Sequence, residues 1–457
     1  MFKKIINNSQ ISKNIKLLLL ISLIFFLIKW GTSFYFITED LAAKIIFESV
    51  SDGSFFYPLI KFLSNLEFNN SLNPMISNLN TVPMPFGSIL IHTFFYKIFG
   101  LSGLIIVDFF GIFLFFLIFF NIFLFFNTKY NSIFFTLMLF SMPLIFEVFL
   151  SKYVNTPPIS QFRDFFTLRV HRPFPASLYF FSVIFLVIKM NYHLIFKKRY
   201  FILIGVLLGL SLSSFYYFFI IEVFFLSLFF IYKFKSKILE KLLQNYKCIL
   251  VLLLSFFIVS LPFIINLFYT ENDVLVSAAL TEITNEKKIY LLKYYLSKVF
   301  ELKFIFLNFF LLSLIIFIRK LKIKNLQIAD IFYLIYLSTL LAPFIFIIFT
   351  TKVSLLHHFN NSIVMYASLS FLISSIIIFQ KKFNFNLNLF IILLVILSIF
   401  SIQLIQKISN YKEIDTKRYE FNEVVKIIKL NQKKINLDTL LTFNTEFMTW
   451  GILNDKI

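Results

Sequence analysis

The amino-acid sequence predicts an all-α polytopic membrane protein, and its composition supports this fold class. Of the 457 residues, 59% are hydrophobic and only 14% are charged, whereas about a quarter of the residues in ordinary soluble domains are charged. Phe alone contributes 70 residues. A soluble globule cannot bury that much apolar surface, because its surface-to-volume ratio leaves too few interior positions. The composition therefore excludes a cytosolic enzyme, a disordered chain and a secreted disulfide scaffold.

Apolar runs along the chain predict about eleven transmembrane helices, since a helix needs about 20 apolar residues to cross a bilayer. The expected spans are 17–37, 102–126, 132–150, 177–193, 201–217, 218–234, 248–268, 304–318, 330–350, 361–379 and 387–405. The stretch 201–234 is too long for one crossing, so we expect a hairpin near Ser211–Ser214. The segment 85–99 is apolar but short. This predicts an interfacial helix on the outer surface, with His92 and Lys97 reaching the lipid headgroups.

Basic residues predict the orientation of these helices in the membrane. The stretch 1–16 is basic and precedes an apolar helix without a cleavage site, so we expect a cytoplasmic N-terminus and an uncleaved anchor. The basic clusters at 197–199 and 319–324 then also lie inside, and the C-terminus lies outside. We attribute the net charge of +20 to this topogenic excess and to attraction for anionic membrane lipid, rather than to nucleic acid. The expected location is a bacterial inner (plasma) membrane.

The predicted topology leaves four long segments on the outer side. They are 38–101, 151–176, 269–303 and 406–457. We divide the chain into a transmembrane domain, residues 1–405, and a short α/β tail, residues 406–457. The first outer loop is expected to contain interfacial helices.

The tail shows two local patterns. Helical spacing connects its apolar residues Phe421, Val424, Val425 and Ile428. The segment 439–443 is typical of a short strand. A chain of this length forms only a marginal core of its own, so we expect the tail to pack on the outer loops.

Glu39 and Asp40 form an acidic pair within three residues of the end of the first predicted span, at Ile37. A carboxylate half-shielded at the membrane surface can act as a general base on a hydroxyl group, or it can bind a divalent cation. The pair is also explained by helix-end charges that only mark the interface. The residues alone leave these interpretations open.

The loop 151–176 places arginines on the outer side, where the positive-inside rule disfavours them. Its charged cluster consists of Arg163, Asp164, Arg169, His171 and Arg172. Arg binds phosphate oxygens through a bidentate fork, and Arg169 and Arg172 share one face if the loop is helical. Two explanations of these arginines remain open. They bind phosphate or pyrophosphate, or they pair with acids of the first loop or with lipid headgroups.

The remaining titratable residues predict no metal centre. The single cysteine, Cys248, excludes an intrachain disulfide and a Cys-rich zinc site. The pair His357-His358 lacks an evident third ligand, and adjacent side chains point apart. Asp108 and Glu222 lie near the outer ends of their predicted spans, where we expect ordinary solvation.

The order of these features resembles the GT-C class of membrane glycosyltransferases. These polytopic enzymes use polyprenyl-phosphate-linked sugars, and they include protein O-mannosyltransferases and aminoarabinose transferases. The resemblance is carried by the acidic pair 39–40, the Pro-Met-Pro-Phe-Gly segment 83–87, the Lys-Ile-Phe-Gly segment 97–100 and the Gly-Val-Leu-Leu-Gly-Leu-Ser segment 205–211. It extends from residue 17 to the neighbourhood of residue 220.

This resemblance implies a GT-C-like fold and roles for particular residues. In the family, an acid just after the first helix activates or positions the acceptor, and Asp40 or Glu39 occupies that place. A second acid follows the third helix, and Asp164 is the nearest match. On this interpretation, the donor phosphate is bound by the basic residues of the second loop, Arg163, Arg169, His171 and Arg172.

The sequence thus predicts an inverting glycosyltransferase of the cell envelope. It would move a hexosyl or pentosyl group from a polyprenyl-phosphate-linked donor to a glycan, lipid or protein acceptor on the outer face. The alternatives are a flippase or transporter for lipid-linked glycans and a non-catalytic assembly protein. A transporter should show charges near the bilayer midplane and paired broken helices, and we find no such pairing. No cofactor is assigned beyond the alternative of a divalent cation at Glu39 and Asp40.

Overall fold

The computed structural model describes residues 8–36, 40–48, 53–65, 86–125, 132–133, 135–137, 174–193, 197–269, 281–282, 284–321, 326–349, 352–353, 366–367, 369–378, 415–431 and 445–454. These residues form α-helices and one very short two-stranded sheet. The helical class predicted from composition is therefore confirmed.

The helices follow one another in four groups along the chain. The first group is α1 (Asn8–Phe36), α2 (Leu41–Glu48), α3 (Gly53–Ser64), α4 (Phe86–Phe99) and α5 (Leu101–Leu124). The second is α8 (Phe174–His193), α9 (Lys198–Leu212), α10 (Tyr216–Phe234), the 3₁₀ turn η2 (Lys235–Lys237), α11 (Ile238–Gln244) and α12 (Tyr246–Tyr269). The third is α14 (Asn285–Val299), α15 (Leu302–Lys320) and α16 (Leu326–Phe349), and the last is α19 (Asp415–Asn431) and α20 (Thr445–Leu453). Strand β1 (Thr281–Glu282) pairs antiparallel with β2 (Lys352–Val353).

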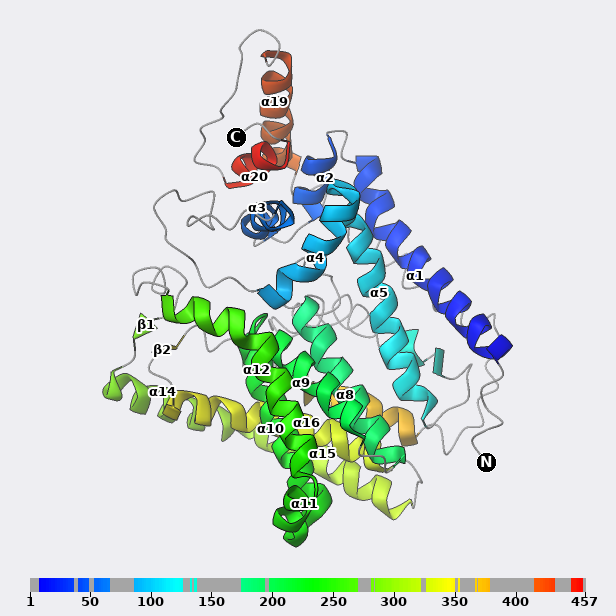
Figure 1. The fold of residues 1–457 in the computed structure, drawn as a ribbon, viewed down its shortest axis with the longest axis vertical. Coiled ribbons are helices and arrows are strands. Elements are labelled where there is room, and N and C mark those ends of the chain that lie inside the picture. The colour runs from blue at the N-terminus through cyan, green and yellow to red at the C-terminus, as the bar shows by residue number, and fades with distance from the viewer. Residues whose placement is uncertain are drawn as a thin grey trace.

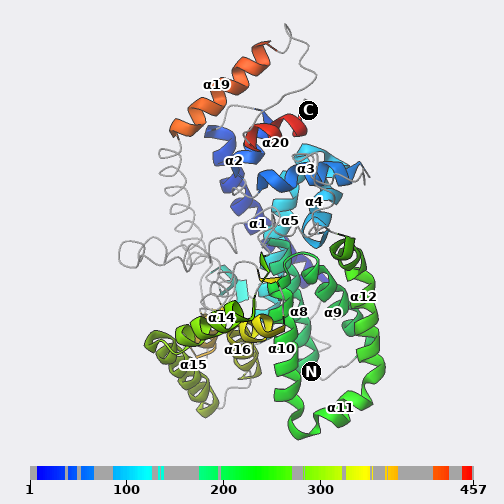
Figure 2. The same cartoon turned by 90° about the vertical axis from the view of Figure 1, so that its left-hand side faces the viewer.

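Two hydrophobic cores organise these helices. The smaller core joins α1 to α5 with the C-terminal helices, and it includes Trp30, Tyr57, Val425 and Trp450. The larger core contains the other ends of α1 and α5 together with α8, α9, α10, α15 and α16. Figure 1 shows α2, α3, α19 and α20 gathered at one end of the molecule, which we call the Asp40 end, while α11 lies at the opposite end. Figure 2 shows α9, α10 and α12 side by side above α11.

Several of the helices are long and apolar enough to cross a membrane. The four described segments that meet this requirement are 101–124, 216–244, 246–265 and 327–349. Shorter apolar helices cover 15–27, 176–192 and 369–378. The chain is thus a helical membrane protein. The count of eleven crossings stays a prediction, because most of the span 132–150 and all of 387–405 lie outside the described residues.

The stretch 201–234 forms the predicted helical hairpin. Helix α9 ends at Leu212, α10 begins at Tyr216, and the turn between them is closed by a hydrogen bond from the Phe215 N–H to the Ser211 carbonyl at 2.9 Å. The predicted helix in the tail is present as α19, whereas the expected strand at 439–443 lies outside the described residues.

Helix α4 connects the two cores. It ends at Phe99, and the next residue, Gly100, has a positive φ of +58°, which favours glycine. At the other end of α4, the Gly87 N–H donates to the Ser213 carbonyl at 3.2 Å. His92 is completely buried, so the expectation that it reaches the headgroups is wrong. The side chain lies within the protein, with Nδ1 3.1 Å from the Ser88 carbonyl, whereas Lys97 is exposed.

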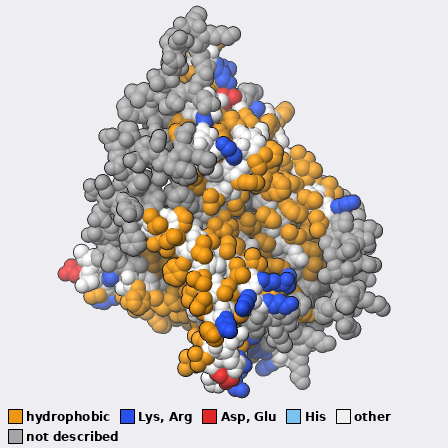
Figure 3. All heavy atoms as spheres, in the orientation of Figure 1, with side chains coloured by type: hydrophobic (Ala, Val, Ile, Leu, Met, Phe, Trp, Pro, Cys, Tyr) orange, Lys and Arg blue, Asp and Glu red, His pale blue; other side chains and the backbone are white. Residues whose placement is uncertain are grey.

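Basic side chains lie at the α11 end of the helices. Lys197 precedes α9, Lys198 and Arg199 lie in its first turn, and Lys235 and Lys237 precede α11, all of them exposed. Figure 3 shows Lys and Arg gathered toward this end, below a surface dominated by hydrophobic side chains. This distribution agrees with the positive-inside rule if the α11 end is cytoplasmic.

Thiol labelling tests this orientation. A cysteine at Asn65, an exposed residue after α3, is expected to react with an impermeant reagent in intact cells. A cysteine at Ser236, which is exposed beside α11, is expected to react only after permeabilisation. The background is Cys248→Ser, and mass spectrometry measures the labelling. Reaction of residue 236 in intact cells would reverse the predicted orientation.

Candidate functional site

Among the site residues predicted from the sequence, the structure describes Asp40. The other predicted site residues lie outside the described residues: Glu39, Arg163, Asp164, Arg169, His171 and Arg172. The candidate site is therefore built from Asp40 and the groups that contact it.

Asp40 begins helix α2. Its backbone carbonyl accepts from the Lys44 N–H at 3.1 Å, and its side-chain Oδ1 accepts from the Ala43 N–H at 2.9 Å. Asp is a favoured residue at this position because its carboxylate satisfies an N–H group that the helix leaves unpaired. The partial positive charge of the helix N-terminus also stabilises the anion. The local sequence therefore fixes the direction of the carboxylate soon after α1 ends.

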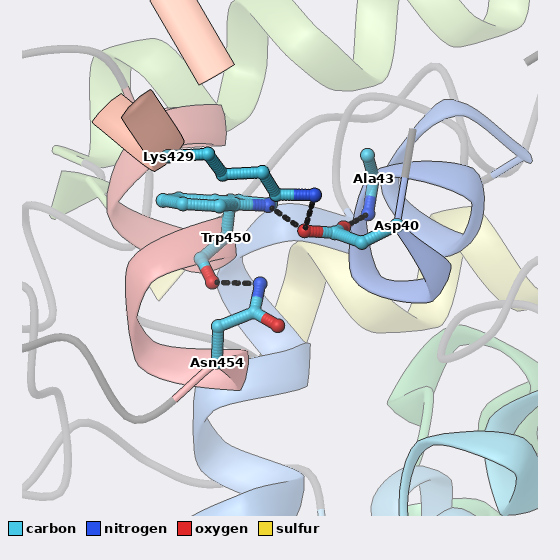
Figure 4. Close-up of polar contacts among 5 residues, drawn as sticks. All are labelled: Asp40, Ala43, Lys429, Trp450 and Asn454. Atoms are coloured by element: carbon cyan, nitrogen blue, oxygen red, sulfur yellow. Dashed lines mark hydrogen bonds and ion pairs between the residues drawn. The ribbon is translucent and has the colours of Figure 1, made fainter. Parts of the chain in front are cut away.

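Two residues of the distant C-terminal segment complete the site. The Trp450 indole Nε1–H donates to Asp40 Oδ2 at 2.9 Å, and the Lys429 Nζ lies 3.2 Å from the same oxygen. Figure 4 shows the indole and the ammonium group both directed at this carboxylate, from α20 and α19 respectively. The acid is thus held from two sides by groups that lie about 400 residues further along the chain.

The C-terminal segment is anchored firmly enough to place Trp450. The indole is only 1% exposed and packs in the smaller core. The Lys61 ammonium group of α3 donates to the Ile452 carbonyl, and the Asn454 side-chain amide donates to the Trp450 carbonyl at 3.0 Å. The tail therefore packs on the first loop, as its size led us to expect.

Among the described residues, the contacts of Asp40 leave its carboxylate able to accept one further donor. An ionised carboxylate has about four lone-pair sites. Three donors, the Ala43 N–H, the Trp450 indole and the Lys429 ammonium group, occupy three of them in Asp40. The Asp40 side chain is 21% exposed and Lys429 is 46% exposed, so a ligand can reach this pair from solvent. The arrangement can orient a hydroxyl or amine donor and offer an ammonium group to an anion beside it.

The described partners of Asp40 do not fit a divalent cation. Oδ2 faces an N–H donor and an ammonium group, and a metal ion there would be repelled by the charge of Lys429. The part of the chain that the structure describes also contains no group of three or more His, Cys, Asp or Glu side chains able to hold a metal ion.

Two further acids are more deeply buried than the sequence predicted. Asp108 is 1% exposed, and the Trp30 indole donates to its Oδ2 at 3.2 Å. Glu222 is fully buried, and the Ser211 hydroxyl donates to its Oε1 at 3.0 Å. The expectation of ordinary solvation is wrong for both residues. Helix α1 covers Asp108, and the turn of the α9–α10 hairpin, which α4 covers, brings Ser211 to Glu222.

Sequence reasoning missed Lys429 and Trp450. One signal was present: the chain contains only two tryptophans among 70 phenylalanines. Both indoles donate to a carboxylate, Trp30 to Asp108 and Trp450 to Asp40. A rare indole in a Phe-rich chain was therefore a marker of a required N–H donor, although the sequence did not indicate its acceptor.

Replacement of the two donors is expected to separate their contributions. Trp450→Phe keeps an aromatic ring but removes the N–H and part of the buried indole, and we expect a loss of about 1.5–3 kcal/mol or more in stability because the acceptor is charged and buried volume is lost. Lys429→Gln should cost less, within about 1 kcal/mol, because the ion pair is half exposed. Thermal unfolding measures both, with Lys426→Gln on the same helix as the control. A larger loss for Lys429→Gln than for Trp450→Phe would contradict this ranking.

The fold and site define a helical membrane protein with a solvent-accessible acid at the end of its first long helix. Comparison with known protein families, with curated proteins and with solved structures finds no match to this chain.

Proposed function

We propose that this protein is a membrane glycosyltransferase of the GT-C type. It transfers a sugar from a polyprenyl-phosphate-linked donor to an acceptor on the outer face of the membrane. The observation that supports the proposal most directly is the position of Asp40 and the partial exposure of its carboxylate. This carboxylate stands at the start of α2, just after α1, is partly exposed and retains room for one donor.

In the proposed reaction, Asp40 accepts the proton of the acceptor hydroxyl or amine. The acceptor atom attacks the anomeric carbon, the bond from that carbon to the phosphate oxygen breaks, and the polyprenyl phosphate leaves with the electron pair. The Lys429 ammonium group, 3.2 Å from Asp40, orients this carboxylate on the acceptor's side of the sugar. In an inverting transfer the phosphate departs from the opposite side, where basic residues of the second loop stabilise its negative charge, a contribution that is usually large in enzymes. Glu39 and Asp164 keep the roles that the family resemblance implies, and the arginines of the second loop keep the phosphate-binding role inferred from the chemistry of their guanidinium groups.

A second candidate function is a carrier for lipid-linked glycans. Its supporting observation is Glu222, an acid that is buried completely between helices, because ionisable residues inside membrane helices commonly serve transport. A carrier would move its substrate without breaking the bond between sugar and phosphate.

A reconstitution experiment separates the two functions. The purified protein is inserted in vesicles that contain radiolabelled polyprenyl-phosphate hexoses or pentoses. Release of polyprenyl phosphate together with a labelled acceptor is expected for a transferase. Movement of intact donor across the bilayer without cleavage would favour the carrier. Absence of cleavage with every donor, by protein that is still folded, would reject the transferase proposal.

A further inference from the structure

The buried end of the α9–α10 hairpin contains a polar cluster that the proposed transferase reaction does not use. At its centre is Glu222 on α10. Its Oε1 accepts from the Ser211 hydroxyl at 3.0 Å, whereas its Oε2 has no hydrogen-bond partner among the described residues. The carboxyl group is 0% exposed. A buried carboxylate oxygen without a partner is costly, so its presence requires an explanation.

Tyr366 is a second buried polar residue in this region, and it interacts electrostatically with Glu222. Its hydroxyl lies within electrostatic reach of Glu222, is buried and likewise has no hydrogen-bond partner in the described part of the chain. Its ring contacts Phe180 of α8, with centroids 5.2 Å apart, and Phe180 in turn contacts Phe218 of α10. Tyr366 therefore packs on Phe180 of α8, and the same Phe180 ring contacts α10 one turn before Glu222.

The cluster is closed toward the Asp40 end. Helix α4 covers the hairpin turn through the hydrogen bond from Gly87 to Ser213 and a hydroxyl contact of 2.5 Å between Ser88 and Ser214. A side chain at Gly87 would overlap with the Leu210 carbonyl, so α4 packs tightly against the end of α9. The oxygens of Glu222, Ser211 and Tyr366 are therefore enclosed by protein.

The charge of Glu222 determines which kind of ion this buried cluster can bind. No Lys, Arg or His among the described residues pairs with Glu222, and burial of an unpaired carboxylate is strongly unfavourable. The last turn of α9, which contains Ser211, adds the partial negative charge of a helix C-terminus. One carboxylate balances one positive charge, whereas a divalent ion would leave a buried excess. Oxygen ligands and helix C-termini are a combination that membrane carriers use for Na⁺.

We propose that Glu222, Ser211 and Tyr366 form a binding site for a small dehydrated monovalent metal cation, for which Na⁺ is the probe. This site is separate from Asp40, and it does not depend on the proposed transfer reaction. The cation neutralises Glu222 and ties α9, α10 and the segment at 366–378 together.

Binding of radiolabelled Na⁺ to the purified full chain tests the site. We expect one ion per chain, and we expect Na⁺ to raise the unfolding temperature relative to choline at equal ionic strength. Glu222→Gln should abolish both effects, whereas the control Glu240→Gln, an exposed acid on α11, should retain them. Binding of less than a tenth of an ion per chain by the wild type, with equal unfolding temperatures in Na⁺ and choline, would overturn the proposal. It would mean that Glu222 is a neutral acid bonded to Ser211.

Milder variants keep the test decisive if Glu222→Gln fails to fold. Ser211→Ala and Tyr366→Phe each remove one oxygen and preserve the carboxyl group. Each should weaken Na⁺ binding several-fold without loss of the one-to-one stoichiometry. Unchanged binding in both variants would place the cation elsewhere and reject this site.

Discussion

Sugar transfer by the Asp40→Asn variant is expected to fall by about 10²–10⁴-fold, the usual contribution of a general base. The variant should still fold, with a lower unfolding temperature, because its amide nitrogen replaces Oδ2 opposite Trp450 and Lys429. Asn is as good a helix-capping residue as Asp, so its side-chain oxygen can keep the hydrogen bond from the Ala43 N–H. Residue 40 also follows the apolar part of α1, where an amide costs little. Release of polyprenyl phosphate by the purified protein measures the effect.

The control for this prediction is Glu240→Gln, which removes an exposed carboxylate on α11 at the opposite end of the molecule. It should leave transfer unchanged. Glu39→Gln should be milder than Asp40→Asn if Glu39 only orients its neighbour, and the reverse ranking would exchange the two roles. Full complementation of a null strain by the double variant would contradict the transferase proposal and leave the carrier or assembly function.

The unfolding temperature is expected to fall by several degrees in the Gly205→Leu variant. Gly205 and Gly209 of α9 face α12, and a Cβ at residue 205 would overlap with the Leu252 carbonyl and the Ser255 hydroxyl. Small residues spaced by four let the backbones of membrane helices approach closely. Overpacking of a tight contact typically costs about 1–3 kcal/mol, and a backbone carbonyl cannot move aside as a flexible side chain can.

The matched control is the same substitution in α1. A Cβ at Gly31 would meet nothing within 4 Å, so Gly31→Leu should preserve the unfolding temperature or raise it slightly through better helix propensity. Equal destabilisation by the two variants would show that the α9–α12 contact is not the cause. Fluorescence or light scattering of the detergent-solubilised protein during heating measures both.

Several local features were accessible from the sequence because they depend on neighbouring residues. The length of the apolar stretch 201–234 required a hairpin, and the structure turns at residues 213–215. The spacing of Val424, Val425 and Ile428 required a helix, and α19 is there. The acidic pair marked the end of the first helix, and Asp40 begins α2. Periodicity, length and capping chemistry operate within a few turns of chain, so one sequence suffices to detect them.

The partners of the acids could not be found in this way. Trp450 and Asp40 are separated by 410 positions, and Trp30 and Asp108 by 78. No periodic pattern connects residues so far apart. The same limit explains the error on Glu222 and Asp108, since distance from a helix end predicts solvation only when no other element covers the side chain.

By itself, the sequence determined that this chain is a helical membrane protein, because the apolar fraction and the length of its runs leave no soluble alternative. It also determined the hairpin, the amphipathic tail helix and an acid at the start of α2. Only the tertiary structure decided that Lys429 and Trp450 complete the Asp40 site and that Glu222 lies in a closed cluster. The physical reason is that the burial of a side chain and the identity of its partner depend on which helices pack together. That packing is determined by contacts across both hydrophobic cores and not by the sequence of any one segment.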